Sequence, residues 1–320
     1  MLLALPMLTE AQSLEALTSV DPFTLTLAPQ YPAPGASVTV TALSGNIDLA
    51  NATMQVSVGN ASVYKGAVKS VEVPVGKVGE LTTIRVTITA NGASYSKTVS
   101  VRPQDLVLVS EPLSTAPPLY LGKAGTPLGG SVRIVAIASF RDGAGRSLDP
   151  AALSYAWTMD GARQAAMSGI GKNVVVVASP LQYRDRSVSV TVASGNGSFV
   201  SGAALSIVPV LPHLRIYEND PLLGVRFDRA LGGAYEIRGA EAPLFAALYS
   251  FPILASAPAV TWYLNGRAAE SGPSITLRPT GRGAGTASLS LVAAIGDVAR
   301  ATSALSLSFG SEEGSNFFGL

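Results

Sequence analysis

The sequence predicts an all-β chain built from three tandem antiparallel β-sandwiches, and three observations support this fold class. The motif Trp-x-x-Asx-Gly occurs twice, in YAWTMDG (155–161) and in VTWYLNG (260–266). The two copies lie about a hundred positions apart, which is the length of one small β-domain. Much of the remaining chain alternates apolar and polar residues with period two, as half-buried strands do, and it rarely has the spacing of an amphipathic helix.

A third, weaker copy of the motif lies one repeat upstream. In ATMQVSVGNA (52–61), Val56 occupies the tryptophan position and Gly59-Asn60 occupies the turn. Self-similarity at a fixed period indicates tandem copies of one structural unit. We therefore expect one sandwich around each copy of the motif.

Each copy is flanked by segments that predict the same strands. Downstream lie pairs of alternating strands joined by Gly-rich turns, at 83–103, 187–209 and 287–309. Upstream lie single alternating strands, at 37–44, 131–140 and 242–251. Alternation gives each strand one buried and one solvated face, which is the usual arrangement in antiparallel sheets.

The motif itself is predicted to be architectural. In a sandwich of this size a tryptophan on the third strand commonly fills the space between the two sheets, and it removes about 150 to 250 Å² from water. The Asx-Gly pair that follows tolerates positive φ and so permits a tight hairpin. We therefore expect Trp157, Trp262 and Val56 to be core residues.

The repeat divides the chain into five parts: a leader (1–20), three sandwiches (21–103, 104–210 and 211–310) and a flexible tail (311–320). The leader has an apolar core at 2–8 and small residues before a cleavage site after Ala11, but no positive residue precedes the core. The favoured interpretation is a remnant signal peptide with a clipped start. The alternative is that the stretch is not a signal.

The motif copies also carry a family resemblance. The pattern at 155–161 and its partner at 261–266 resemble bacterial immunoglobulin-like (Ig-like) modules and the related polycystic-kidney-disease-like (PKD-like) modules. The chain after residue 20 also resembles secreted multi-Ig proteins of small-genome bacteria, through DLVLVSEP (105–112), YENDPLLG (217–224) and SITLR (274–278). The resemblance implies Ig-like sandwiches on a secreted or surface protein, and it brings no known activity or catalytic residue.

Composition argues against several classes of function. The net charge is +1, so the chain lacks the basic field that binds nucleic acid. It has no cysteine, which excludes disulfides, thiolate metal sites and a cysteine nucleophile. Its single histidine, His213, follows a Pro-rich linker, so we expect neither a Ser-His-Asp triad nor a histidine metal site. We expect no catalytic residue and no cofactor. After the leader, no run approaches the roughly 20 apolar residues of a transmembrane helix.

Two stretches remain as candidate sites. Glu218 and Asp220, with Asp228 as a third carboxylate, are weak calcium candidates, because Ca²⁺ takes six to eight oxygen ligands. The favoured alternative is an ordinary turn opened by Asp-Pro. In the tail, Phe317 and Phe318 follow a polar linker, and they are interpreted either as a frayed terminus or as a docking tag that fills a partner's pocket.

The leading functional hypothesis is a non-enzymatic, secreted or cell-surface structural or interaction protein. Pro-containing linkers at 102–104 and 209–212 favour a semi-rigid rod of Ig-like domains. The alternatives are an adhesin or carbohydrate-binding module, or an accessory part of a pilus or secretion apparatus. The expected partner is a protein or glycan at the cell surface. The aromatic candidates for glycan contact are Tyr183, Tyr217, Tyr235 and Tyr249.

Overall fold

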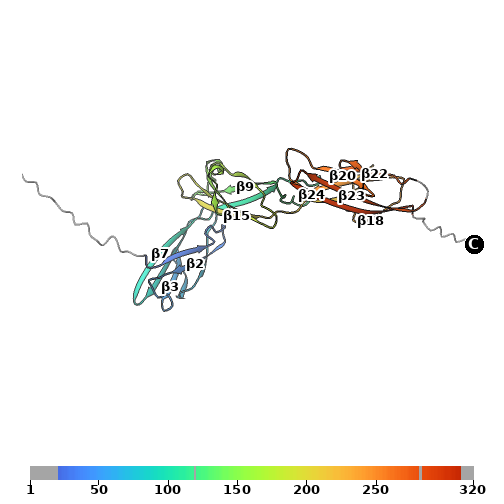
Figure 1. Ribbon diagram of the computed structural model, residues 1–320. Coiled ribbons are helices and arrows are strands. Elements are labelled where there is room, and N and C mark those ends of the chain that lie inside the picture. The colour runs from blue at the N-terminus through green and yellow to red at the C-terminus, as the bar shows by residue number, and fades with distance from the viewer. Residues whose placement is uncertain (1–20, 119, 281–282, 311–320) are drawn as a thin grey trace, which may run out of the picture. The chain divides into compact units, whose positions relative to one another are not determined.

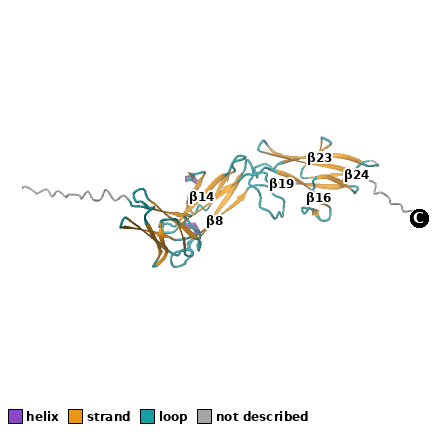
Figure 2. Cartoon of the chain, turned by 90° about the horizontal axis from the view of Figure 1, so that it is seen from below, coloured by secondary structure: helices purple, strands orange, loops and turns teal. Residues whose placement is uncertain are grey.

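The computed structural model describes residues 21–118, 120–280 and 283–310. Regular structure in this part of the chain is β-strand, apart from two short 3-10 helices, η2 (Pro150–Ala152) and η3 (Ala165–Met167). Figure 2 shows strands and loops throughout the described chain. The predicted fold class is confirmed, since the strands form three successive pairs of sheets.

The first sandwich pairs a three-stranded sheet, β1-β2-β5, with a four-stranded sheet, β4-β3-β6-β7. All of its neighbouring strands are antiparallel. Its strands are β1 (Thr24–Ala28), β2 (Ser37–Leu43), β3 (Thr53–Val58), β4 (Ala61–Ala67), β5 (Val71–Pro74), β6 (Thr82–Ala90) and β7 (Ala93–Val101). Buried residues alternate along β2 and β6, so the two sheets enclose one core between them.

The second sandwich repeats this order with β13-β9-β8 in one sheet and β11-β10-β14-β15 in the other, where β12 also pairs with β10. Its strands are β8 (Asp105–Pro112), β9 (Ser131–Ser139), β10 (Ser154–Met159), β11 (Ala162–Arg163), β12 (Gly169–Ile170), β13 (Val174–Ala178), β14 (Arg186–Ala193) and β15 (Val200–Ile207). Strand β8 follows Pro103 and Gln104 directly and forms one edge of its sheet.

The third sandwich has sheets β17-β16-β19-β22 and β18-β24-β23-β20-β21. Its strands are β16 (His213–Asp220), β17 (Gly224–Val225), β18 (Gly233–Ile237), β19 (Ala242–Tyr249), β20 (Ala259–Leu264), β21 (Arg267–Ser271), β22 (Ser274–Leu277), β23 (Gly285–Ile295) and β24 (Ala299–Phe309). One pair departs from the antiparallel direction of the other strands, because β18 runs parallel to β24. The chain reaches β18 by crossing from one sheet to the other and not through a hairpin, so the antiparallel direction is not imposed.

The three copies of the motif occupy the same place in their sandwiches. Val56 lies opposite Val86, Trp157 opposite Val190 and Trp262 opposite Leu291, each where the strand that carries the motif pairs with the first strand of the C-terminal hairpin. This equivalence, with the strand order above, is the arrangement of an Ig-like sandwich. Figure 1 labels several of these strands along the chain.

By contacts between residues the chain divides into two compact units. Unit 1 comprises the described residues within Met1–Asp105, Ser139–Leu148 and Asn196–Ser201. Unit 2 comprises those within Leu106–Ala138, Asp149–Gly195 and Gly202–Leu320.

Candidate functional site

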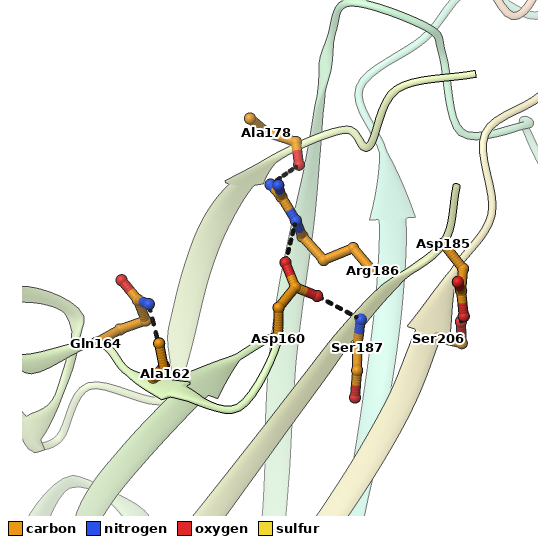
Figure 3. A network of polar contacts seen from close by, with 8 residues as sticks. All are labelled: Asp160, Ala162, Gln164, Ala178, Asp185, Arg186, Ser187 and Ser206. Carbon is orange, nitrogen blue, oxygen red and sulfur yellow. Dashed lines mark hydrogen bonds and ion pairs between the residues drawn. The ribbon is translucent and has the colours of Figure 1, made fainter. Parts of the chain in front are cut away.

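The Asx-Gly turns are fixed by hydrogen bonds to a neighbouring strand. Figure 3 shows Asp160, whose side chain accepts bonds from the Ser187 amide at 3.0 Å and from Arg186 Nε at 3.1 Å. Asn265 does the same in the third sandwich, accepting from the Ser288 amide at 2.9 Å. Asp160 and Asn265 have φ of 48° and 49°, and the glycine that follows each is also at positive φ. These turns are therefore two-residue hairpin turns pinned to the sheet, which is an architectural role.

The tryptophans are enclosed. Trp157, Trp262 and Val56 each have 0% exposure. Both indoles donate through Nε1 to a backbone carbonyl, Trp157 to Lys172 at 2.8 Å and Trp262 to Gly272 at 3.0 Å. A buried indole N–H needs such a partner, so neither ring is left to bind a ligand.

Two of the three calcium candidates have other partners. Asp220 Oδ1 accepts from the amides of Leu222 and Leu223 at 2.8 and 2.9 Å, and these bonds hold its pKa below the ordinary value. Asp228 pairs with Arg226 at 3.2 Å, and this partner lowers the Asp228 pKa. In the part of the chain that the structure describes, no group of three or more His, Asp or Glu residues is placed to hold a metal ion.

Glu218 and Asp228 do share a surface, the wall of a charged cleft of about 590 Å³. The cleft lies in unit 2, between the end of β16, the segment 226–234 and the turn that leads into β19. Half of its lining is charged, whereas charged residues are 13% of the whole chain, so charge is concentrated here. The charged members are Glu218, Arg226, Asp228, Arg229, Glu236, Arg238 and Glu241.

Most of these charges are already paired along the wall. Arg238 lies 2.9 Å from Glu236, and Glu241 lies 2.8 Å from Arg278. Burial, followed by the charge of Glu218 and a hydrogen bond to it, raises the pKa of Tyr235 to about 12. The wall thus offers guanidinium donors, carboxylate acceptors and one phenol hydroxyl. Such an array can hydrogen-bond a polar, hydroxylated ligand in several directions.

Other predicted residues lie elsewhere. His213 stacks on Tyr249 with ring centroids 4.8 Å apart, outside the cleft lining. Tyr217 and Tyr249 are buried with their hydroxyls 2.8 Å apart, so they are not open glycan contacts. Tyr183 is 93% exposed. The leader, Phe317 and Phe318 lie outside the described residues.

Sequence reasoning missed the arginines of the cleft. The available signal was the local density of charge in RFDRA (226–230), within a chain that is poor in charge. Within the described ranges, no helix has the length and apolar character needed to cross a membrane.

No protein-family model matches the chain, and no curated protein matches it either. Among solved structures, the three N-terminal domains of the highly immunogenic outer capsid protein (Hoc) of bacteriophage RB49 align over 89% of this chain and 98% of theirs, with 14% identity and a TM-score of 0.25. The fibronectin(III)-like modules of Clostridium thermocellum CbhA align over 63% of this chain and 93% of theirs, with 9% identity and a TM-score of 0.25. The central fibronectin-III array of RIM-binding protein aligns over 90% and 96%, with 10% identity and a TM-score of 0.30. The fold assignment rests on the strand order and not on these scores.

Proposed function

We propose that this chain is a non-enzymatic structural or interaction protein, secreted or displayed at a cell surface, whose Ig-like domains form a semi-rigid rod. The observation that carries the proposal is a set of backbone hydrogen bonds between two sandwiches of unit 2. Residues 113–115, just after β8, pair with residues 250–253, just after β19. We call this set the junction clamp.

The junction clamp resembles a short piece of β-ladder. The Thr115 amide donates to the Phe251 carbonyl at 2.8 Å, and the Ser250 amide donates to the Thr115 carbonyl at 2.9 Å. The Ile253 amide donates to the Leu113 carbonyl at 3.0 Å. Successive backbone bonds of this kind restrain rotation far more than a free linker does, because several must break together.

A second contact supports the clamp from the linker side. The Val210 amide donates to the Thr126 carbonyl at 2.9 Å. At Gly125 the packing is tight, since an added Cβ would lie 2.5 Å from Val210 Cγ2 and 2.7 Å from Ser250 Oγ. The Pro-containing linker at 209–212 is therefore held at its side as well as stiffened by its own sequence.

In unit 1, the linker at 102–104 is fixed through Gln104, which is 2% exposed. Its side-chain amide accepts from the Arg141 amide at 2.8 Å and donates to the Arg141 carbonyl at 3.1 Å, as a neighbouring strand would. The Gly79 amide donates to the Pro103 carbonyl at 2.9 Å. Each linker is thus held by hydrogen bonds, at Pro103 and Gln104 in one and at Val210 in the other, which supports a semi-rigid arrangement.

Distance measurements test the rigidity. The chain has no cysteine, so spin labels on Ala162→Cys and Ala268→Cys, both exposed, report only the distance between the second and third sandwiches. We expect a narrow distribution that broadens in Thr115→Pro, which lacks the clamp's amide donor. A broad distribution in the parent chain, or a compact particle in small-angle scattering, would contradict the rod. Cell fractionation of the producing organism tests the surface location.

The cleft supports a second candidate function, the recognition of a glycan. Paired charges and Tyr235 form a polar wall that suits vicinal hydroxyls. A glycan array with Arg229→Ser tests this, because Arg229 lines the cleft. Arg267→Ser, on exposed β21, is the matched control. Binding that is absent, or that survives Arg229→Ser unchanged, would remove the cleft as the site.

A further inference from the structure

The outer face of the β8-β9-β13 sheet is apolar and uncovered. Five β-branched residues on it are 43 to 51% exposed: Val107, Val109, Ile137, Val174 and Val176. The alternating burial of β9 and β13 places them on one side of the sheet, away from the core. We call this surface the valine face. An exposed apolar patch on one sheet marks an interaction site more often than chance.

The corresponding face of the first sandwich is polar, which shows that the fold does not require an apolar surface here. Its outward positions on β1 and β2 include Thr24, Thr26 and Thr41. The hydroxyls of Thr24 and Thr26 donate to backbone carbonyls of β2. Threonine keeps the β-branched shape that suits strands while remaining solvated.

The corresponding face of the third sandwich is apolar but covered by the chain itself. Tyr217 and Tyr249 are buried on it, under a layer that includes Phe227 and Val225. Phe227 packs edge-on against Tyr217, with centroids 5.2 Å apart, and against Phe245, at 6.1 Å. In the third sandwich, this apolar face is therefore covered by a loop that packs its own apolar side chains onto it.

The second sandwich lacks such a cover because the equivalent segment is used elsewhere. In the third sandwich the cover is the segment that follows β16. In the second, the segment that follows β8 runs into the junction clamp and bonds to residues 250–253. The valine face is left without an intramolecular partner among the described residues.

The chemistry of the face defines its partner. The ion pair on it, Arg133 with Glu111, is internally neutral, and Asp105 at the start of β8 is the one further charge at the outward positions of its three described strands, so the face has little net charge. It therefore suits a small, uncharged apolar projection. The chain carries one at Pro221-Leu222-Leu223-Gly224, where Leu222 is 94% and Leu223 74% exposed.

This leucine turn is held in shape before any partner binds. Asp220 accepts from the amides of both leucines, so the two side chains project from a fixed backbone. Preorganisation of this kind lowers the entropic cost of docking. The leucine turn and the valine face lie on different sandwiches, and both are exposed, so the turn does not cover the face within one chain.

We propose that the leucine turn of one copy docks on the valine face of a second copy. Because the two surfaces differ, the contact is head-to-tail, and each copy keeps one free turn and one free face for further copies. The contact is weak individually and accumulates where many copies are held close together, as on a surface. The inference goes beyond the proposed structural role, which the spin-label distances test independently.

Sedimentation of complementary variants tests the proposal. Leu222→Ser/Leu223→Ser removes the turn, and Val174→Thr/Val176→Thr removes part of the face while keeping the strand. The parent chain should show a weight-average mass that rises with concentration above the 32.7 kDa monomer, and each variant alone should remain a monomer. An equal mixture should form a dimer and nothing larger, since only one intact turn and one intact face meet. Leu43→Ser and Val63→Thr, both at exposed positions, are the matched controls and should behave as the parent.

Several results would overturn it. A parent chain that stays monomeric at every concentration removes self-association. A turn variant that associates like the parent indicates face-to-face pairing instead, and a mixture that stays monomeric removes the turn-to-face contact.

Cross-linking gives a second readout that does not depend on folding of the serine variants. In this cysteine-free chain, Leu222→Cys mixed with Val176→Cys should form the mixed disulfide in excess over Leu222→Cys mixed with Ala162→Cys. Equal yields from the two mixtures would contradict the docking.

Discussion

The Asx residue of each turn contributes stability that a short mutational series can measure. In the third sandwich, Asn265→Ala removes the side-chain acceptor of the Ser288 amide. The lost bond accounts for about 1 kcal/mol. It also places alanine at φ of 49°, where a residue with a Cβ is disfavoured by about 1 kcal/mol or more. The free energy of unfolding of this sandwich should therefore fall by about 2 kcal/mol.

Asn265→Gly separates the two causes. It loses the same side-chain bond but tolerates positive φ, so the loss should be only about half as large. The opposite change is available in the first sandwich, where Gly59 takes the Asx position at φ of 55° and its amide already donates to Thr83. An added Cβ at Gly59 would meet no atom within 4 Å. The next residue, Asn60, is not at positive φ, so this turn needs glycine at its first position, and Gly59→Asn should be destabilising despite the open space.

Urea unfolding followed by the emission of Trp262 measures the two Asn265 variants, whereas Gly59→Asn, in a sandwich without tryptophan, is followed by circular dichroism. Trp157→Phe is introduced into every protein compared, so that the signal comes from the third sandwich alone. Equal losses for the alanine and glycine variants would show that backbone strain plays no part. A loss below about 0.5 kcal/mol for alanine would show that the motif's Asx is interchangeable with other residues.

Three further results are expected. Trp157→Ala and Trp262→Ala should each destabilise their own sandwich by about 3 to 5 kcal/mol in urea unfolding, because both rings are fully enclosed; losses below about 1 kcal/mol would contradict this. Gln104→Ala should cost about 1 kcal/mol and increase proteolysis near the linker, since it removes both bonds to the part-buried peptide groups of Arg141; an unchanged cleavage rate would argue against the bonds. Bonds to backbone amides lower the pKa of Asp220 below 3.8, so the stability that its carboxylate contributes to the turn is complete above pH 3.8 and is lost as the pH falls through the lower folded-state pKa. The Leu222 amide should lose its protection from hydrogen exchange in that pH range. Asp220→Asn, which does not titrate, should show no such step.

The strands could be predicted from the sequence because their causes are local. The segments 37–44, 131–140 and 242–251 alternate with period two, and β2, β9 and β19 lie within them. The motif tryptophans were placed in the core because a tryptophan at this place in a sandwich of this size commonly fills the space between the two sheets. The parallel pairing of β18 with β24 was missed, because pairing direction depends on a crossover that alternation does not record.

The cleft and the junction clamp could not be predicted from local sequence patterns, because both depend on the path of the loop that follows the first strand of a sandwich. Residues 113–130 and 221–232 both follow the first strand of a sandwich, and neither has a periodic pattern that fixes its path. One bonds to Phe251 and leaves a valine face open, whereas the other folds back, buries Tyr217 and lines the charged cleft. The shared strands explain why the sandwiches fold alike. The different paths of the loop after the first strand explain why the surfaces of the two sandwiches offer different chemistry. Substitutions in these loops should therefore change the binding of ligands or partners before they change the fold.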